Sequence, residues 1–454
     1  MFAIWGHNDA AKLAYYGIHS LQHRGQEGVG IVVTDGEKKN IHKGPGLLNE
    51  TFQPSDLEEL EGHAAIAHAR YSTALDGKGI ANVQPLLFRS QKGGLAIAHN
   101  GSLVNARQLR YQLESQGSIF QSSTDAEIFA HLIKRSGFQT LEEQLINALS
   151  MVKGAYALMV MDENQLLVAL DPTGIRPLSI GRFGEAYVVA SETCAFDIIG
   201  ATFERDVEPG ELIIIDKDGM RSRQIAKASA REICSMEYIY FARPDSNLAG
   251  INVHTARKNL GKQLAIEAPV EADVVTGVPD SSISAAIGYA EQSGIPYELG
   301  LIKNRYIGRT FIQPSQSLRD QGVKMKLSAV RGVVDGKRVV IIDDSIVRGT
   351  TSKRIVHMLR EAGAKEVHVR ISSPTIQYPC YYGIDMLTKE ELIAANYSIE
   401  EIKDIIGADS LQFLSVEGLL KGIGLFKEGT KCGQCRACFT GNYPTEIYPD
   451  FNGI

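Results

Sequence analysis

Short apolar runs, each ended by glycine, aspartate or asparagine, characterise the first half of the chain. Runs of this kind are typical of β-strands. They predict strands at residues 30–34, 64–68, 94–98, 155–160, 165–169, 186–190 and 211–215. Apolar positions recur with helical spacing in residues 105–115 and 125–133, where Ile128, Leu132 and Ile133 share one face. The first half is therefore predicted to consist of stacked sheets with helices outside them.

The hydrophobic pattern changes after a polar stretch at residues 221–231, which has no sustained apolar periodicity. Strands and helices alternate beyond it. The predicted strands are 273–277, 297–302, 338–342 and 366–371, and the predicted helices are 282–292 and 351–362. Buried strands joined by helices indicate a parallel α/β sheet. We place the domain boundary near residue 228, which gives an α+β domain at 1–228 and an α/β domain at 229–454.

Length and charge narrow the class of protein. A chain of 454 residues fits two or three domains of about 100–200 residues each. The 47 Lys and Arg residues are outnumbered by 53 Asp and Glu residues, and the net charge of −6 argues against a basic nucleic-acid binder. No apolar run approaches the roughly 20 residues of a membrane helix, and residues 1–6 lack the features of a secretion signal. We expect a cytoplasmic protein that binds neither nucleic acid nor membrane.

Two adjacent carboxylates, Asp343 and Asp344, follow the predicted strand 338–342, and a loop of small residues leads from them into a helix. Open α/β sheets bind ligands at the carboxyl ends of their strands, and a helix N-terminus offers N–H groups to a phosphate. Paired carboxylates can hold a sugar diol and help to retain Mg²⁺. The hydroxyl groups around the phosphate would be those of Ser345, Thr350 and Thr351. An acidic N-cap is the alternative for a lone Asp-Asp pair, but the whole pattern over 337–351 favours a phosphate site.

This stretch resembles the signature of the type I phosphoribosyltransferases, whose substrate is phosphoribosyl pyrophosphate. The resemblance implies that Asp343 and Asp344 contact the ribose hydroxyls and Mg²⁺, and that the following loop binds the 5-phosphate. The implied loop residues are Ser345, Arg348, Gly349, Thr350 and Thr351. A second family element, a short loop that contacts pyrophosphate, is matched by Gly277, Val278, Pro279, Asp280 and Ser281. Ser281 is implied as a further Mg²⁺ contact.

Three basic residues lie where this family has a mobile loop that closes over the pyrophosphate. They are Lys303, Arg305 and Arg309. The resemblance implies that they contact the substrate. Solvated surface charge is the alternative for all three, and it stays open above all for Arg309.

Four short motifs in the first half are individually weak. They occupy residues 21–28, 68–73, 99–101 and 123–125, and the Asn-Gly of the third is common in hairpin turns. In this order they resemble the N-terminal-nucleophile glutaminase domain of the glutamine amidotransferases. The resemblance implies that Arg70 binds the α-carboxylate of glutamine, that Asp125 binds its α-ammonium group, and that Asn100 with the Gly101 amide forms the oxyanion hole.

A chain that contains both kinds of domain resembles the glutamine phosphoribosylpyrophosphate amidotransferases. The segment at residues 235–246 also resembles that family. The implied fold is an α+β N-terminal-nucleophile hydrolase domain followed by an α/β type I phosphoribosyltransferase domain with a C-terminal cluster-binding segment. The implied reaction begins with hydrolysis of glutamine. The ammonia then passes through an interdomain channel to the ribose C1, displaces pyrophosphate and gives 5-phosphoribosylamine, the first committed step of purine synthesis. Inhibition by purine nucleotides and a homotetramer are also implied.

The chain departs from this family at its start. The family's nucleophile is a cysteine at the first residue of the mature protein, and its own α-amino group acts as the base. The sequence opens Met1-Phe2-Ala3, and its first cysteine is Cys194. As printed, the chain is expected to bind glutamine without a residue to attack it. We expect a start assigned too late, because these enzymes often carry a short propeptide.

Six cysteines are too few for a disulfide scaffold in a chain of this length, but three of them form Cys-x-x-Cys-x-x-Cys at 432–438. Residue chemistry leaves zinc and an iron–sulfur cluster both open, with free buried thiols as the alternative, for Cys194 in particular. The resemblance implies the subgroup with a structural 4Fe–4S cluster. The implied ligands are Cys234, Cys380, Cys435 and Cys438, which leaves Cys432 uncoordinated.

Three other functions are weighed against this one. A glutaminase that feeds another acceptor, such as a sugar phosphate, does not explain the pattern at 337–351. A regulator that senses phosphoribosyl pyrophosphate would need an output domain, and the predicted domains leave no segment for it. An ammonia-dependent phosphoribosyltransferase with a non-functional glutaminase domain also fits the chain as printed.

Overall fold

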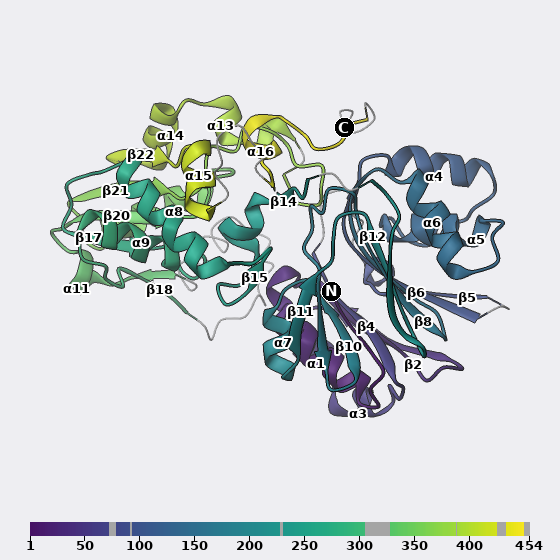
Figure 1. The fold of residues 1–454 in the computed structure, drawn as a ribbon. Helices are drawn as coiled ribbons and strands as arrows, with labels where there is room; N and C mark the ends of the chain where they lie inside the picture. Colours follow the sequence, from purple (N-terminus) through teal and green to yellow (C-terminus); the bar gives the residue numbers. More distant parts are fainter. Residues whose placement is uncertain are drawn as a thin grey trace.

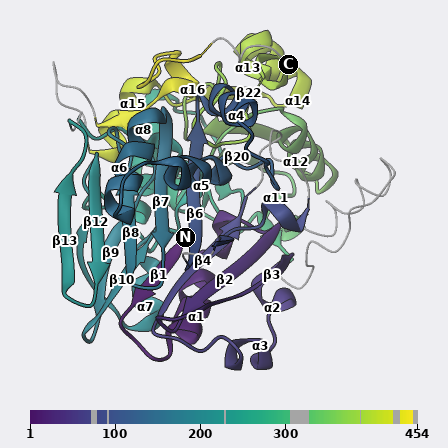
Figure 2. The same ribbon diagram turned by 90° about the vertical axis from the view of Figure 1, so that its right-hand side faces the viewer.

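The computed structural model describes residues 1–71, 79–90, 93–227, 230–304, 327–386, 388–424 and 433–448. The two halves of the chain lie side by side, with the purple and blue strands of the first half on the right and the green helices of the second on the left (Figure 1). After a rotation by 90° the strands of the first half are seen face on, and those of the two sheets overlap (Figure 2). Within the described ranges, no helix has both the length and the apolar character that crossing a membrane requires.

Two antiparallel sheets stack in the first half. The seven-stranded sheet has the order β11 (Thr202–Asp206), β9 (Ser179–Phe183), β10 (Ala186–Ala190), β1 (Phe2–Trp5), β4 (Ala64–Arg70), β2 (Gly28–Thr34) and β3 (Lys39–Pro45). The six-stranded sheet has the order β13 (Gly219–Gln224), β12 (Glu211–Asp216), β8 (Gln165–Leu170), β7 (Gly154–Met161), β6 (Gly93–Leu103) and β5 (Leu86–Ser90). Alternate residues of each strand face the other sheet, where Ile66 and Val32 pack with Met159 and Ile213.

Helices cover the outer face of each sheet, as the apolar periodicity predicts. The outer face of the seven-stranded sheet packs against α1 (Ala10–Ser20) and α7 (Cys194–Ile199). The outer face of the six-stranded sheet packs against α4 (Ala106–Ser115), α5 (Ala126–Arg135) and α6 (Leu141–Met151). Shorter elements connect them: η1 (Gln22–Arg24), α2 (Leu48–Thr51), α3 (Pro54–Glu58) and η2 (Ile80–Asn82). The predicted stacked sheets with outer helices are confirmed.

The second half is built on the predicted parallel sheet, in the order β17 (Val274–Gly277), β20 (Arg338–Asp343), β21 (Glu366–Ile371) and β22 (Ser410–Phe413). One face packs against α8 (Val253–Glu267), α9 (Ile283–Ser293) and α15 (Val416–Ile423). The other packs against α11 (Arg331–Val334), α12 (Thr350–Glu361), α13 (Ile393–Asn396) and α14 (Ile399–Ile406). The remaining elements are β14 (Ile233–Cys234), η3 (Glu237–Phe241), β15 (Asn247–Leu248), β16 (Ile251–Asn252), β18 (Leu301–Lys303), β19 (Leu327–Ala329), η4 (Lys389–Glu391), β23 (Gln434–Cys435) and α16 (Ala437–Thr440).

Two expectations need correction. The strand expected at 297–302 is divided: Tyr297 forms only an isolated parallel bridge with Val275 of β17, and the strand itself, Leu301–Lys303, pairs antiparallel with β19 outside the parallel sheet. The polar stretch that begins at residue 221 starts inside β13, an edge strand with little apolar content. This strand is held partly by charge, because Arg221 and Arg223 of β13 form ion pairs with Glu142 of α6, at 3.5 and 3.3 Å. The predicted boundary at residue 228 lies outside the described residues.

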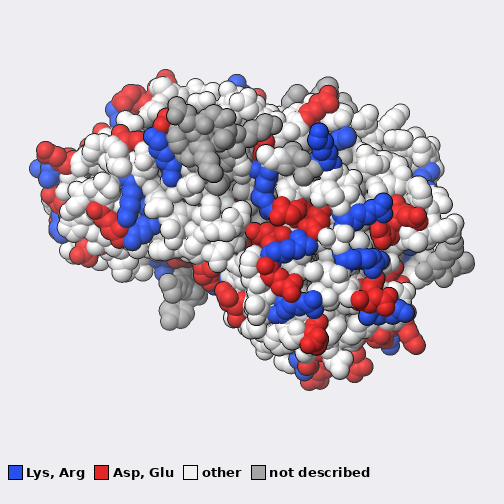
Figure 3. All heavy atoms as spheres, viewed as in Figure 1, with Lys and Arg blue, Asp and Glu red and all other residues white. Residues whose placement is uncertain are grey.

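Charges of both signs are interspersed over the first half on the face shown in Figure 3. Several form ion pairs between neighbouring strands. Arg182 of β9 pairs with Glu204 of β11 at 2.9 Å, and Arg205 of β11 pairs with Glu211 of β12 at 2.8 Å. Polar strands of this kind are therefore stabilised by their neighbours rather than by an apolar pattern of their own.

Candidate functional site

A pocket of about 290 Å³ lies in the first half, where ends of both sheets meet. His68 of β4 and Asn100 and Gly101 of β6 line it, with Asp125 at the start of α5. Residues of the second half complete the wall: Phe241 and Gly383. Three of the four residues implied for glutamine, Asn100, Gly101 and Asp125, are therefore brought to one cavity.

Asn100 has a fixed orientation in this pocket. Its Oδ1 atom lies 3.0 Å from Nε2 of His68, and its Nδ2 atom donates a hydrogen bond to Oγ of Ser191 at 3.2 Å. The α-amino nitrogen of Met1 lies 3.0 Å from the same Oγ atom. Burial lowers the pKa of this amino group to about 4, and burial lowers the pKa of His68 to about 3. The α-amino group of Met1 and the His68 imidazole are therefore uncharged at neutral pH. Through Ser191, the start of the chain lies beside Asn100.

Gly101 lies within strand β6, so the His-Asn-Gly motif is not a hairpin turn. Its φ of +127° favours glycine, and a Cβ atom at this position would lie 2.2 Å from the carbonyl oxygen of Ala155. The carboxylate of Asp125 accepts hydrogen bonds from the Leu103 amide at 2.8 Å and the Ser102 hydroxyl at 3.3 Å. The carboxylate of Asp125 is thus held against the backbone of β6 at one end of the pocket.

Arg70, the fourth residue implied for glutamine, lies next to the pocket rather than in its wall. It is buried at the end of β4 and donates a hydrogen bond to the Gly79 carbonyl at 3.1 Å. Its neighbours Ala69 and Tyr71 line the pocket, but Arg70 itself does not. The rest of its motif, residues 72–73, lies outside the described residues.

A buried network of charges joins the two halves next to this pocket. Arg24 donates hydrogen bonds to both carboxylate oxygens of Glu237, at 2.7 and 2.8 Å, and to Glu192 at 2.6 Å. Arg176 donates to Glu237 at 3.2 Å. Burial acts to raise the pKa of Glu192, but the Arg24 charge and the contacts with His23 and Ser246 together outweigh it and hold that pKa far below its usual range. Arg24 and Glu237 each lie in a motif of the sequence, but nothing in either motif indicates that they pair.

The predicted acidic pair lies at the carboxyl end of β20. Because β17 runs parallel to β20, with Gly277 opposite Ile342, the two implied substrate loops leave the same edge of the sheet. The Ser281 hydroxyl donates to the Asp344 carboxylate, and the Ser282 hydroxyl donates to Asp343 at 3.2 Å. Burial raises the pKa of both aspartates, and the Asp344 carboxylate raises that of Asp343 further. The site therefore favours a cation beside the pair.

The loop after the acidic pair ends at Gly349, whose φ of +76° precedes the first turn of α12. Thr350 and Thr351 are exposed at this helix N-terminus, where free N–H groups and hydroxyls can meet a phosphate. Ser345 donates to the Asp344 carboxylate at 2.9 Å. Arg348 does not join them, because its guanidinium donates to Glu391 of η4 at 2.7 Å.

The implied pyrophosphate loop packs against the neighbouring strand end. The Val278 amide donates to the Ile342 carbonyl at 2.9 Å, and the Pro279–Asp280 peptide bond is cis. Lys303 of β18 donates to the Asp280 carboxylate at 2.7 Å, so this lysine lies beside the loop. Arg305 and Arg309 lie outside the described residues.

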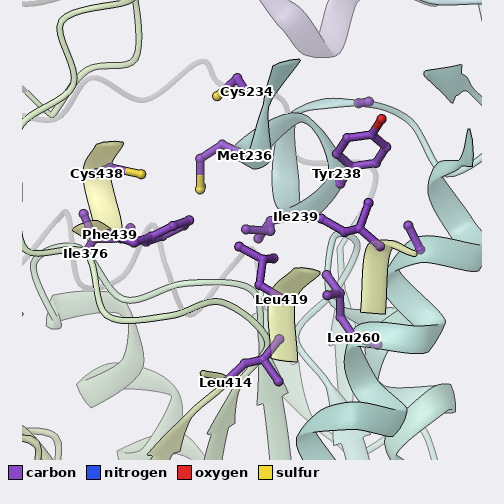
Figure 4. Packing of buried hydrophobic residues seen from close by; sticks show 14 of the residues in the cluster. Cys234, Met236, Tyr238, Ile239, Leu260, Ile376, Leu414, Leu419, Cys438 and Phe439 are labelled. Atoms are coloured by element: carbon purple, nitrogen blue, oxygen red, sulfur yellow. The ribbon is translucent and has the colours of Figure 1, made fainter. Parts of the chain in front are cut away.

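Four cysteines that are far apart in sequence lie in one buried cluster of the second half: Cys234, Cys380, Cys435 and Cys438. Cys234 of β14 and Cys435 of β23 are opposite each other in a parallel bridge. The sulfur atoms of Cys234 and Cys438 point into the space between them (Figure 4). Burial, followed by the nearby thiols, raises the pKa of Cys438, and burial raises that of Cys234 to about 12. Without a bound metal, the thiols of Cys234 and Cys438 would therefore stay protonated at neutral pH.

The other cysteines are separate from this group. Cys194 lies in α7 of the first half, with its sulfur 3.8 Å from Glu192, and Cys432 lies outside the described residues. None of the described cysteines forms a disulfide. Among the described side chains, no set of three or more His, Cys, Asp or Glu is arranged to hold a single metal ion.

Comparison with known proteins gives matches to both halves. The family model of a glutamine amidotransferase domain matches residues 68–197, and that of a phosphoribosyl transferase domain matches residues 252–373. An amidophosphoribosyltransferase of Bacillus subtilis (strain 168) is 70% identical over 451 residues, which cover 99% of this chain and 94% of the relative. An amidophosphoribosyltransferase of Staphylococcus aureus (strain MRSA252) is 52% identical, covering 99% and 91%.

A solved structure agrees over the whole chain. It is the glutamine phosphoribosylpyrophosphate amidotransferase of B. subtilis complexed with ADP and GMP. Its TM-score is 0.94 at 69% identity, and the match covers 99% of this chain and 98% of that one. With two domain models matched in order, and relatives this similar over nearly their full length, the chain belongs to the amidophosphoribosyltransferase family.

Proposed function

We propose that this chain makes 5-phosphoribosylamine from phosphoribosyl pyrophosphate and the ammonia released from glutamine, the first committed step of de novo purine biosynthesis. The buried pair of Asp343 and Asp344, at the sheet edge where both substrate loops begin, is the observation that carries the proposal. A glutaminase that feeds another acceptor, such as a sugar phosphate, has no comparable use for it. The domain boundary near residue 228 fits, because β13 ends at Gln224 and β14 begins at Ile233.

The chain's own residues divide the work between two sites. In the first half, Asp125 and Arg70 would bind the amino-acid end of glutamine, while Asn100 and the Gly101 amide would stabilise the oxyanion. In the second half, Asp343 and Asp344 would hold the ribose hydroxyls, and residues 345–351 the 5-phosphate. Mg²⁺, when bound beside these carboxylates and Ser281, would neutralise charge on the pyrophosphate.

The reaction then joins the two sites. The ammonia nitrogen would form a bond to the ribose C1 as the bond from C1 to pyrophosphate breaks. A closed interdomain route for ammonia is supported by the pocket itself, because Phe241 and Gly383 of the second half form part of its wall. Closure matters because ammonia released into water would be protonated and lost as a nucleophile.

The second-half chemistry is tested with ammonia in place of glutamine. An ammonium salt at alkaline pH, with phosphoribosyl pyrophosphate and Mg²⁺, should release pyrophosphate. Asp344→Asn should lower that rate roughly 10²-fold or more, because the carboxylate orients the reacting sugar. Asp273→Asn, at the opposite end of β17 and paired with Arg338, is the matched control and should change the rate little. Equal rates for the two variants would remove Asp344 from the mechanism.

The glutaminase chemistry needs a nucleophile, and the contacts of Met1 support a position for it near Asn100. The amino nitrogen of Met1 lies within hydrogen-bond distance of Ser191, which also binds Asn100. If Cys-Gly-Val replaced Met1, the cysteine would be the first residue, and its own α-amino group could act as the base. We propose that glutamine hydrolysis depends on such a cysteine.

The test compares the chain as printed with one in which Cys-Gly-Val replaces Met1 and processing exposes the cysteine. We expect glutamine-dependent phosphoribosylamine from the second protein alone, while both proteins use ammonia. Glutamine turnover by the printed chain would overturn the proposal. Failure of the cysteine-bearing chain would instead indicate a phosphoribosyltransferase that works only with free ammonia.

The four clustered cysteines offer the ligands that an iron–sulfur cluster needs. They are buried, unpaired by disulfides, and drawn from three separate segments of the second half. We infer that Cys234, Cys380, Cys435 and Cys438 hold a structural 4Fe–4S cluster, because the proposed reaction transfers no electrons.

Control by purine nucleotides is the regulation that we propose. It is supported by the B. subtilis structure complexed with ADP and GMP, which is 69% identical to this chain. A homotetramer and a cytoplasmic location stay predictions from the sequence.

A further inference from the structure

Gly383 of the second half touches the backbone of Gly101 in the wall of the glutamine pocket. A Cβ atom on Gly383 would lie 2.9 Å from both the carbonyl carbon and the carbonyl oxygen of Gly101, and 3.2 Å from an Nη atom of Arg176. Unbonded carbon atoms in contact are about 3.5–4.0 Å apart. The two backbones therefore leave no room for a side chain between them.

Gly101 also has little room within its own domain. A Cβ atom on Gly101 would lie 2.2 Å from the carbonyl oxygen of Ala155 on strand β7. The backbone of Gly101 is thus close both to β7 of its own domain and to Gly383 of the other. A shift of Gly383 toward Gly101 would have to be taken up by rotation of the Gly101 peptide groups.

The segment that presents Gly383 is held from several directions through Tyr382. Arg176 donates two hydrogen bonds to the Tyr382 carbonyl, at 2.9 and 3.2 Å. The Tyr382 amide lies 3.5 Å from the sulfur of Cys380, and its hydroxyl lies 2.9 Å from Oγ1 of Thr445. Since Tyr382 is also fully packed, at 2% exposure, the peptide that leads into Gly383 has little freedom.

We propose that Gly383 is a positioning residue for glutamine hydrolysis: it holds the Gly101 backbone from the second domain so that the Gly101 amide points into the pocket. This inference rests on the proposed function, in which that amide donates to the oxyanion. It also means that the glutaminase site is incomplete without the second domain. The short segment between Cys380 and Gly383 connects a cysteine of the buried cluster to that site.

Gly383→Ala tests the inference, with Gly117→Ala as the matched control. Gly383 has a φ of +97° and Gly117 a φ of +90°, so both variants carry a similar backbone strain. A Cβ atom on Gly117 would meet no atom within 4 Å, whereas one on Gly383 meets Gly101. Differences between the two variants therefore report on the contact.

The first measurement is amide hydrogen exchange of a peptide spanning residues 97–104, in the full chain as printed. Gly383→Ala should raise exchange at Gly101 and its neighbours about tenfold or more, and Gly117→Ala should leave it unchanged. The second measurement uses the protein that carries Cys-Gly-Val in place of Met1. There Gly383→Ala should lower the ratio of glutamine-dependent to ammonia-dependent kcat roughly 10²-fold, with little change in the KM for glutamine.

Unchanged exchange in residues 97–104, or a kcat ratio equal to that of Gly117→Ala, would overturn the role of Gly383. A general folding defect would lower both rates and leave their ratio unchanged, which also counts against it. If the unsubstituted cysteine-bearing protein fails to use glutamine, the proposed glutaminase function falls, and the exchange measurement alone still decides whether Gly383 positions Gly101.

Discussion

Asp343 and Asp344 lie in a less polar environment than most carboxylates. Both are under 9% exposed, and their hydrogen-bond donors include the hydroxyls of Ser281 and Ser282. Burial raises the pKa of each, and the second carboxylate raises that of Asp343 further. Ionising this pair in the substrate-free protein therefore costs free energy, which a bound cation would offset.

Asp343→Asn should consequently stabilise the substrate-free protein at neutral pH while it abolishes turnover. The pKa of Asp343 is higher in the folded chain than in the unfolded chain. At a pH between these two pKa values, the folded chain therefore binds more protons than the unfolded chain. Its stability consequently falls as pH rises through the folded-state pKa. Asparagine does not ionise and avoids this loss. We expect a Tm above that of the parent protein at pH 8, and a difference that vanishes below about pH 4.

Asp273→Asn is a control that should change the Tm in the opposite direction. The hydrogen bonds from Arg338 lower the pKa of Asp273 to about 2, so its contribution to stability is present above the unfolded pKa and is lost as pH falls toward 2. This variant should lower the Tm slightly at pH 8. A decrease of Tm in Asp343→Asn at pH 8, without Mg²⁺ or substrate, would contradict the assignment.

The two-residue strands β14 and β23 depend on each other more than on their own sequences. Each is too short to be stable alone, and their parallel bridge aligns Ile233 with Gln434 and Cys234 with Cys435. The Ser235 hydroxyl adds a hydrogen bond to the Cys435 carbonyl at 2.9 Å. A metal cluster bound by these cysteines would hold the two segments together and so contribute to folding.

Cys435→Ser should therefore lose the cluster. Protein purified without oxygen should be brown and contain about four iron atoms per chain, and the variant should contain far less iron and have a lower Tm. Cys194→Ser, which changes the separate cysteine in α7, is the matched control and should keep both. Colourless parent protein with about one zinc per chain would contradict the cluster. Loss of iron in Cys432→Ser alone would change only the choice of ligands.

The two halves are joined through charged groups that water does not reach. Glu237 is fully buried between Arg24 and Arg176 of the first domain, and Glu192 neutralises the other side of Arg24. An ion pair in this environment costs desolvation energy when it forms, but removal of one partner leaves an uncompensated charge. The junction thus tolerates little change at Glu237, and its position beside the pocket couples the stability of the interface to glutamine binding.

Glu237→Gln should destabilise the whole protein by about 3–5 kcal/mol, because two buried guanidinium groups lose their shared anion. Glu204→Gln removes a half-exposed partner of Arg182 and should cost no more than about 1 kcal/mol. Urea unfolding of both variants gives the comparison. If their midpoints agree, the buried network does not stabilise the interface. In the protein that carries Cys-Gly-Val in place of Met1, and below the unfolding midpoint, Glu237→Gln should lose glutamine-dependent activity more than ammonia-dependent activity.

Much of the fold and part of the site could be predicted from local patterns. Short apolar runs specify strands because side chains alternate along a strand, and this held for β10 and β21 nearly to the residue. The Asp343–Asp344 loop was placed at a sheet edge because parallel strands end on the same side. The polar strand β13 and the limits of β18 were missed, because their pairing depends on neighbouring strands rather than on their own hydrophobicity.

Only the tertiary structure decided which distant residues meet. No spacing along the chain indicates that Arg24 pairs with Glu237, that Cys234 faces Cys435, or that Gly383 touches Gly101. The contacts of Arg24 with Glu237 and of Gly383 with Gly101 form where two independently patterned halves pack together, and the packing depends on the shape of both surfaces at once. The sequence by itself therefore determined the elements, the two chemistries and their motifs, while the junction that joins the chemistries follows from close packing, which local periodicity does not encode.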